Sequence, residues 1–97
     1  MAGYRLSARA RRDIDELYEY SIDRFGLAVA QAYFNGLHDV FELLGANPMM
    51  GRSVDHLRAG LRCFVHQRHS IYYRVDDRGP AIQRVLHVAR DPLRAFR

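Results

Sequence analysis

Three short segments with alternating apolar and polar residues follow one another in the last third of the chain, at residues 61–66, 69–76 and 81–88. Gln67-Arg68 separates the first two segments, and residues 77–80 (Asp-Arg-Gly-Pro) separate the second from the third. Links this short, built from residues that favour turns, reverse the chain and pair neighbouring strands antiparallel. This feature therefore predicts an antiparallel sheet of consecutive strands.

Two helical patterns precede these strands. Apolar residues recur at steps of three and four over residues 8–24 and again over residues 28–46, which is typical of helices with one buried face. Ser7 stands where it can cap the first helix, and Gly26 is placed to end it. Pro48 stops the second helix. Because only a few residues link the two helices, we expect an antiparallel helical hairpin.

Together these elements predict one α+β domain over residues 1–97, with the helical hairpin packed on a twisted antiparallel sheet of about four strands. The fourth strand is a short edge strand at Tyr4–Leu6. We expect one face of the sheet to meet the helices and the other to stay open. The acidic residues of the first helix, Asp13 among them, are expected on its solvated face. The residues expected in the core are Ile14, Leu17, Phe34, Leu37, Phe41, Tyr73 and Val75.

The charge balance favours an acidic partner. The net charge is +4, and all 15 basic residues are arginine, whose planar fork suits carboxylates and phosphates. An ordinary solvated surface in an arginine-rich protein is the alternative explanation. No apolar run approaches the roughly 20 residues that span a bilayer, and the first residues lack an apolar signal core, so we expect a cytoplasmic protein with no membrane partner. The single cysteine, Cys63, fits a reducing compartment and a buried strand position.

The residues offer no cofactor or metal site. The five histidines lack ligand spacing, and the seven glycines form no phosphate-binding loop. A basic surface bearing histidine and tyrosine could support RNA cleavage without a metal, because that chemistry needs an acid or base near neutral pH and cations for the developing charge. A cationic groove for acidic side chains is the competing interpretation. The residues concerned are Arg62, His66, His69, Tyr72, Arg74, Arg84 and His87.

Short motifs spread over nearly the whole chain resemble those of one toxin family. They are Tyr4-x-Leu6-Ser7, Phe25-Gly26, Asn47-Pro48-x-x-Gly51-Arg52, Leu57-Arg58-x-Gly60-x-Arg62, His69-x-Ile71-x-Tyr73-Arg74-Val75, Arg84-Val85-Leu86-His87 and the closing Asp91. In this order they resemble the ParE branch of the RelE/ParE superfamily. The resemblance implies the toxin of a type II toxin–antitoxin module, which inhibits DNA gyrase and is neutralised by a ParD-like ribbon-helix-helix antitoxin. Operator DNA is then bound only indirectly, through the antitoxin.

The same resemblance leaves an alternative, the ribosome-dependent mRNA endonuclease of RelE type. Those nucleases typically use lysines and a tyrosine or histidine near the C-terminus, whereas this chain has no lysine and no tyrosine after Tyr73. We therefore expect a toxin that is not an enzyme, with no catalytic residues and no cofactor. A chain that only binds an antitoxin, without toxicity, is a third hypothesis.

Two sets of contact residues follow from this interpretation. An acidic antitoxin tail is expected to pair with arginines on the sheet, and the residues proposed for antitoxin binding are Arg62, Tyr72, Arg74, Arg84 and His87. The segment after the last strand is expected to contact the target through Arg90, Asp91, Leu93 and Phe96. Arg90 stands where the family usually has methionine. For Phe96 two interpretations stay open, docking back on the sheet or contact with the target.

Overall fold

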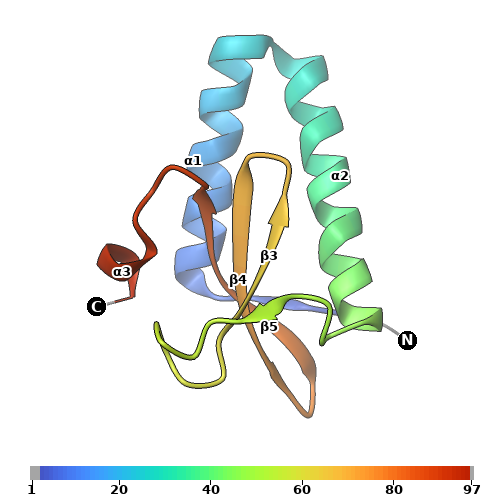
Figure 1. Cartoon of the computed structure of the whole chain (residues 1–97). Coiled ribbons are helices and arrows are strands. Elements are labelled where there is room, and N and C mark those ends of the chain that lie inside the picture. The colour runs from blue at the N-terminus through green and yellow to red at the C-terminus, as the bar shows by residue number, and fades with distance from the viewer. Residues whose placement is uncertain (1–2, 97) are drawn as a thin grey trace.

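The computed structural model describes residues 3–96, which form a helical hairpin packed on a five-stranded sheet (Figure 1). The strand order is β1-β5-β4-β3-β2, and all pairs are antiparallel except β1 with β5. The α+β fold is confirmed, with a fifth strand beyond the predicted four. In chain order the elements are β1 (Arg5–Leu6), α1 (Ala8–Phe25), α2 (Leu27–Ala46), β2 (Arg52–Ser53), β3 (Arg62–His66), β4 (His69–Asp76), β5 (Gly79–His87) and α3 (Pro92–Ala95).

The two long helices begin and end at the signals in the sequence. The Ser7 hydroxyl oxygen accepts the N–H of Ala10 at 2.9 Å and caps α1. Gly26 alone connects the helices: its N–H donates to Ile22 O, and its carbonyl accepts from Ala30 N. Its φ of +88° lies in the region that favours glycine. After this one-residue link, α2 runs back along α1 (Figure 1).

The main core lies between the hairpin and the sheet. It consists of Ala10, Leu37, Val40, Phe41, Leu44, Ile71, Tyr73, Ile82 and Val85. Ile14, Leu17 and Phe34 are half-buried against it, so most of the predicted core is confirmed. The prediction that Val75 is buried was wrong: its exposed fraction is 39%. It pairs with Pro80 beside the β4–β5 turn, which projects past the ends of both helices (Figure 1).

A bulge changes the alternation of β5. Tyr72 pairs with Arg84 while Tyr73 pairs with Ile82, so Gln83 is an extra residue in the ladder. The bulge lets Ile82 and Val85, three residues apart, both face the helices. It also gives Arg84 its position at the edge of the sheet beside α1.

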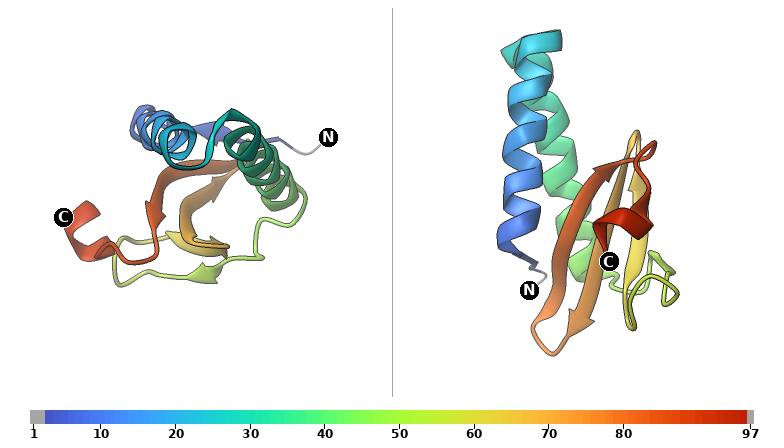
Figure 2. Two further views of the ribbon diagram at one scale, coloured as in Figure 1. Left: turned by 90° about the horizontal axis from the view of Figure 1, so that it is seen from above. Right: turned by 90° about the vertical axis from the view of Figure 1, so that its left-hand side faces the viewer.

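The far face of the sheet is covered, contrary to the expectation of an open face. The loop between β2 and β3 and the segment leading to α3 lie on the side opposite the hairpin (Figure 2). The reason is a second apolar cluster, formed by Val54, Leu61, Cys63, Tyr72, Leu86 and Phe96. Cys63 is 1% exposed, as expected for a small core residue. Burial is the main cause that raises the pKa of its thiol.

Candidate functional site

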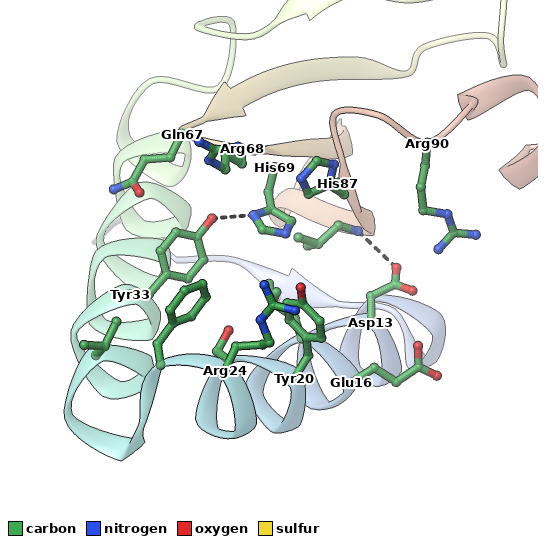
Figure 3. A pocket seen from close by; sticks show the side chains of 15 residues that line it. Asp13, Glu16, Tyr20, Arg24, Tyr33, Gln67, Arg68, His69, His87 and Arg90 are labelled. Carbon is green, nitrogen blue, oxygen red and sulfur yellow. Dashed lines mark hydrogen bonds between the residues drawn. The ribbon is translucent and has the colours of Figure 1, made fainter.

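A groove of about 910 Å³ lies between the half of the hairpin next to Gly26 and the end of the sheet that carries the β3–β4 turn (Figure 3). Side chains of α1 and α2 form one wall, and the β3–β4 turn, the end of β5 and Arg90 form the other. Volumes of about 300–1,000 Å³ are typical of ligand sites in proteins. We call this feature the hairpin groove.

Three histidines form a row across the sheet at this end. His66, His69 and His87 lie directly opposite one another on β3, β4 and β5. The two-residue turn Gln67-Arg68, with Gln67 at φ +53°, sets the register of the first pair. His69 and His87 line the hairpin groove, and their rings lie 5.5 Å apart. The row is thus a product of strand register rather than of sequence spacing.

Tyr33 of α2 lies over this row. Its hydroxyl oxygen is 2.6 Å from His69 Nδ1, and its ring lies 5.7 Å from His66 and 5.5 Å from His69 (Figure 3). Burial lowers the pKa of His69 to about 4, helped by the neighbouring His87 and His66. Burial also raises the pKa of Tyr33 to about 12. At neutral pH the imidazole is neutral and the phenol keeps its proton, so the phenol donates to Nδ1 and the imidazole proton resides on Nε2.

This pair suits hydrogen bonding better than proton transfer. A general base or acid works best when its pKa lies near the working pH. The pKa of His69 is too low for that role at neutral pH, and the pKa of Tyr33 is too high. The Tyr33–His69 pair is therefore suited to hydrogen bonding with a bound molecule.

A buried ion pair lies beside the groove, and one member of the pair, Asp13, belongs to the groove lining. Arg84 Nε lies 2.8 Å from Asp13 Oδ2, and the same carboxylate accepts the N–H of Val85 at 3.0 Å. The side chains of Arg84 and Asp13 are 9% and 3% exposed. The sequence-based placement of Asp13 on a solvated face was wrong: α1 turns this residue toward the edge of β5, where the carboxylate meets Arg84. The pair ties α1 to β5.

The five residues predicted to bind an antitoxin are not gathered in one place. Arg84 is occupied by Asp13, and Tyr72 is 5% exposed in the second cluster. Arg62 donates to the carbonyls of Gly51 and Met49, so it fastens the loop before β2. Arg74 is exposed on β4, and His87 is exposed at the hairpin groove. Only His87 of this set lines the groove.

The segment predicted to contact a target divides in two. Phe96 is 8% exposed and packs on Tyr72 at 5.1 Å between ring centroids, with the Arg58 guanidinium 5.2 Å from its ring. Phe96 therefore docks back on the sheet. Asp91 caps α3 by accepting the N–H of Leu93. Leu93 is 57% exposed, and Arg90 is exposed at the groove rim.

The residues considered for RNA cleavage do not converge. The histidine row faces α2, Tyr72 lies under Phe96 on the opposite face, and Arg84 is held by Asp13. Within residues 3–96, no three side chains of His, Cys, Asp or Glu are arranged to hold a metal ion. No helix of the described part of the chain is long and apolar enough to cross a membrane.

Sequence reasoning missed several groove residues. Tyr33 was passed over in favour of Phe34, although it stands three residues after Ala30 and four before Leu37, both buried. That spacing was a usable signal. Arg24 and Arg68 carried no comparable signal, because an exposed arginine on a helix or turn is ordinary in a chain with this composition.

Comparison with known proteins places this fold among the toxins of bacterial type II toxin–antitoxin systems. The family model described as "ParE toxin of type II toxin-antitoxin system, parDE" matches residues 4–92. The chain belongs to the ParE toxin family, and an antitoxin is the partner that such a system provides. The predicted family is thereby confirmed.

Two curated relatives support this assignment. Toxin ParE1 of Caulobacter vibrioides is 40% identical over 87 residues, which cover 90% of each chain. Toxin ParE1 of Mycobacterium tuberculosis is 34% identical over 89 residues, which cover 91% of each. A solved structure titled "Chromosomal ParDE TA system from P. aeruginosa" has the same fold, with a TM-score of 0.75, 22% identity and coverage of 90% of this chain and 96% of that one.

Proposed function

We propose that this toxin arrests growth by binding DNA gyrase as an inhibitor, without catalysis of its own, and that a ParD-like ribbon-helix-helix antitoxin neutralises it in the cytoplasm. Operator DNA is contacted only through the antitoxin, and no membrane is involved. Gyrase is proposed as the target because the chain belongs to the ParE family, whose model matches residues 4–92.

One observation carries the non-catalytic part of the proposal: the groups suited to RNA cleavage are occupied or separated. Arg84 is neutralised by Asp13, and Tyr72 is covered by Phe96. His69 accepts from Tyr33 and has a pKa of about 4. A RelE-type endonuclease needs a base, an acid and a free cation around one phosphate. Inhibition by contact is therefore favoured over RNA cleavage.

The exposed part of the C-terminal segment is the proposed target surface. Leu93 and Arg90 project from a segment anchored by Phe96, and Asp91 holds the turn that presents Leu93. Arginine and large apolar side chains are effective anchors in protein interfaces. Of the residues first proposed for antitoxin binding, Arg74 and His87 remain candidates for direct contact because they are exposed.

Induction of this chain in growing cells tests the proposal. Incorporation of labelled thymidine, leucine and uridine is followed over the first minutes, with the uninduced strain as control. Gyrase inhibition predicts that DNA synthesis falls first, before protein synthesis, and that antitoxin co-expression restores it. An immediate fall in protein synthesis with cleaved mRNA would favour the endonuclease instead, and no growth arrest would favour a non-toxic binding protein.

A further inference from the structure

We infer that a set of arginines along one edge of the molecule binds the phosphate backbone of duplex DNA, and that this duplex is the DNA that gyrase holds. The four residues are Arg9, Arg12, Arg58 and Arg94, and we call them the arginine edge. The second half of the inference rests on the proposed function, because gyrase is the proposed target. Operator DNA is a separate duplex, which the antitoxin reads.

The arginine edge lies where α1, β5 and α3 meet. The guanidinium of Arg84 joins the three elements: its Nε donates to Asp13 of α1 at 2.8 Å, and its Nη1 donates to Ala95 O at 3.5 Å. α3 accordingly lies on the α1 side of the molecule, away from α2 (Figure 1, Figure 2). Arg12 directly precedes Asp13, and Arg94 directly precedes Ala95, so this contact brings their two segments together.

Arg9 and Arg58 extend the arginine edge in two directions. Arg9 stands four residues before Asp13, and thus on the same side of α1. The Arg58 guanidinium lies 5.2 Å from the ring of Phe96, the residue that follows α3. All four arginines are exposed. The edge therefore spans α1, α3 and the loop between β2 and β3.

The positive charge of the arginine edge is not neutralised within the chain. Among residues 3–96, none of the four arginines forms an ion pair within 4.0 Å. The carboxylate of Asp13 is used by Arg84, and that of Asp91 caps α3. Glu16 is exposed on the same side of α1, and it pairs with none of the four. The surplus of guanidinium groups suits phosphates.

The arginines of α1 do not stabilise their own helix. Arg9 lies in the first turn of α1, which has no acidic residue, and Arg12 follows three residues later. The helix dipole is positive at this end, so cations here work against the stability of the helix. A bound polyanion accounts for their position, whereas helix stability does not.

The composition of this surface fits a nucleic acid better than a protein. The centres of protein interfaces are apolar and depleted in charged residues, whereas DNA interfaces are polar and strongly positive. At the arginine edge the charged groups come from three segments, and the neighbouring Phe96 is 8% exposed. A line of phosphates matches cations that are spread in this way.

The aromatic residues favour a duplex over a single strand. Proteins hold single strands by stacking the bases on exposed aromatic rings. Phe96 and Tyr72, the rings beside the arginine edge, are 8% and 5% exposed and offer no such platform. Tyr20 and Phe25 are exposed, but they lie farther along α1, toward Gly26. Contact with a duplex backbone needs only the cations.

Leu93 connects the arginine edge to the surface proposed to contact gyrase. Leu93 and Arg94 are consecutive residues of α3, and both are exposed. Gyrase holds a DNA duplex while it acts, so a toxin that contacts the enzyme through Leu93 brings its arginines to DNA. Phosphate contacts position a protein on DNA without reading sequence. The arginine edge thus adds affinity for the complex of gyrase with DNA.

The first test measures binding of the full chain to a fluorescently labelled duplex of mixed sequence, by anisotropy over a range of salt concentrations. The triple variant Arg9→Gln, Arg12→Gln, Arg94→Gln is expected to bind at least about tenfold more weakly at low salt, with a salt slope shallower by about 2–3. Because removal of Arg9 relieves the repulsion at the start of α1, its melting temperature should not fall.

Arg11→Gln is the matched control. Arg11 is exposed on the same helix, but at about 100° per residue it lies about 200° around α1 from Asp13. Its duplex affinity should stay within about twofold of wild type. Both variants are then titrated into a supercoiling reaction, where the triple variant should need about tenfold more protein for half inhibition and the control should not. Affinity for the purified antitoxin is measured in parallel.

Each outcome decides the inference. Loss of duplex binding and of gyrase inhibition in the triple variant, with an intact control, supports it. Wild-type duplex affinity in the triple variant overturns it, as does a wild-type chain that prefers single-stranded RNA. Loss of antitoxin affinity with duplex affinity kept would make the edge a protein-binding surface and also overturns it.

Two further outcomes separate the inference from the proposed function. Loss of duplex binding with undiminished inhibition of gyrase overturns the link between the arginine edge and gyrase, and leaves the proposed function intact. A wild-type chain that binds duplex through these arginines but leaves supercoiling unimpaired contradicts the proposed function, and leaves the DNA contact intact.

Discussion

Asp13 and Arg84 form a buried ion pair, at 2.8 Å, that joins the first helix to the last strand. Neither residue is close to the other in sequence, and the carboxylate also accepts the N–H of Val85. Removal of one partner leaves the other charge buried without compensation. The pair therefore matters to the fold chiefly through the cost of breaking it.

We expect Asp13→Ala to lower the free energy of unfolding by about 3–5 kcal/mol, as loss of one member of a buried pair does. Asp15→Ala, at an exposed position two residues along α1, is the control and should change it by no more than about 0.5 kcal/mol. Urea unfolding followed by circular dichroism measures both. Equal, small effects would show that the carboxylate of Asp13 is solvated after all.

Gly51 and Gly36 should respond to alanine in opposite directions. A Cβ at Gly51 would lie 2.6 Å from the Tyr73 hydroxyl oxygen, which accepts the N–H of Gly51, and 2.9 Å from Cys63 O. Gly51→Ala should therefore cost about 1–3 kcal/mol through overpacking. A Cβ at Gly36 in α2 would lie 3.7 Å from His66 Nε2, which is ordinary contact, so Gly36→Ala should stabilise by about 0.5–1 kcal/mol. Thermal unfolding of the two variants checks the signs.

Stability should fall as the pH is lowered from 7 to 5, partly because of His69. Its folded pKa of about 4 lies below the usual 6.5, so the unfolded chain takes up the proton first and stability is lost as the pH falls below 6.5. Tyr33, His66 and His87 face this ring. We expect a loss of about 1 kcal/mol from this group by pH 5, allowing for partial exposure.

The control for this pH dependence is His69→Gln, which cannot titrate. The free energy of unfolding is measured at pH 7 and pH 5 for both proteins, above the range where carboxylates such as Asp55 and Asp76, with lowered pKa, begin to contribute. The difference between the two pH values should be smaller in the variant. An identical difference would mean that His69 is protonated normally in the folded state.

Leu93 and Phe96 should separate toxicity from folding. Phe96 is buried on Tyr72, so Phe96→Ala should lower the free energy of unfolding by about 3 kcal/mol or more. Leu93 is 57% exposed, and Leu93→Asp should leave unfolding and antitoxin binding near wild type but reduce growth arrest. Undiminished growth arrest with Leu93→Asp would remove this segment from the target surface.

The helices and three long strands were predictable because their signals are local. Ser7, Gly26 and the apolar stripes act within a few residues, and the turns at Gln67-Arg68 and before Pro80 define the hairpins. β2 escaped prediction because two residues carry no periodicity. The exposure of Val75 depends on where the helices end, which no strand pattern records.

The site was less predictable than the fold. Burial of Asp13 and Arg84 depends on the crossing of α1 over the edge of β5, and a bulge at Gln83 shifts the register there. The covering of Tyr72 by Phe96 depends on the path of residues 88–96. The sequence shows the histidines of the row as residues of predicted strands. Their partner Tyr33 lies on a helix, 36 positions before His69 in the sequence.

The central claim is that this toxin inhibits gyrase by stoichiometric contact. Titration of the purified chain into a supercoiling reaction at fixed gyrase concentration tests it most directly, with ribosome-dependent cleavage of mRNA measured in parallel. If the toxin acts by contact, inhibition rises with the ratio of toxin to gyrase, is relieved by the antitoxin and occurs without mRNA cleavage. Unimpaired supercoiling at a large excess of toxin, together with mRNA cleavage at substoichiometric amounts, would contradict it.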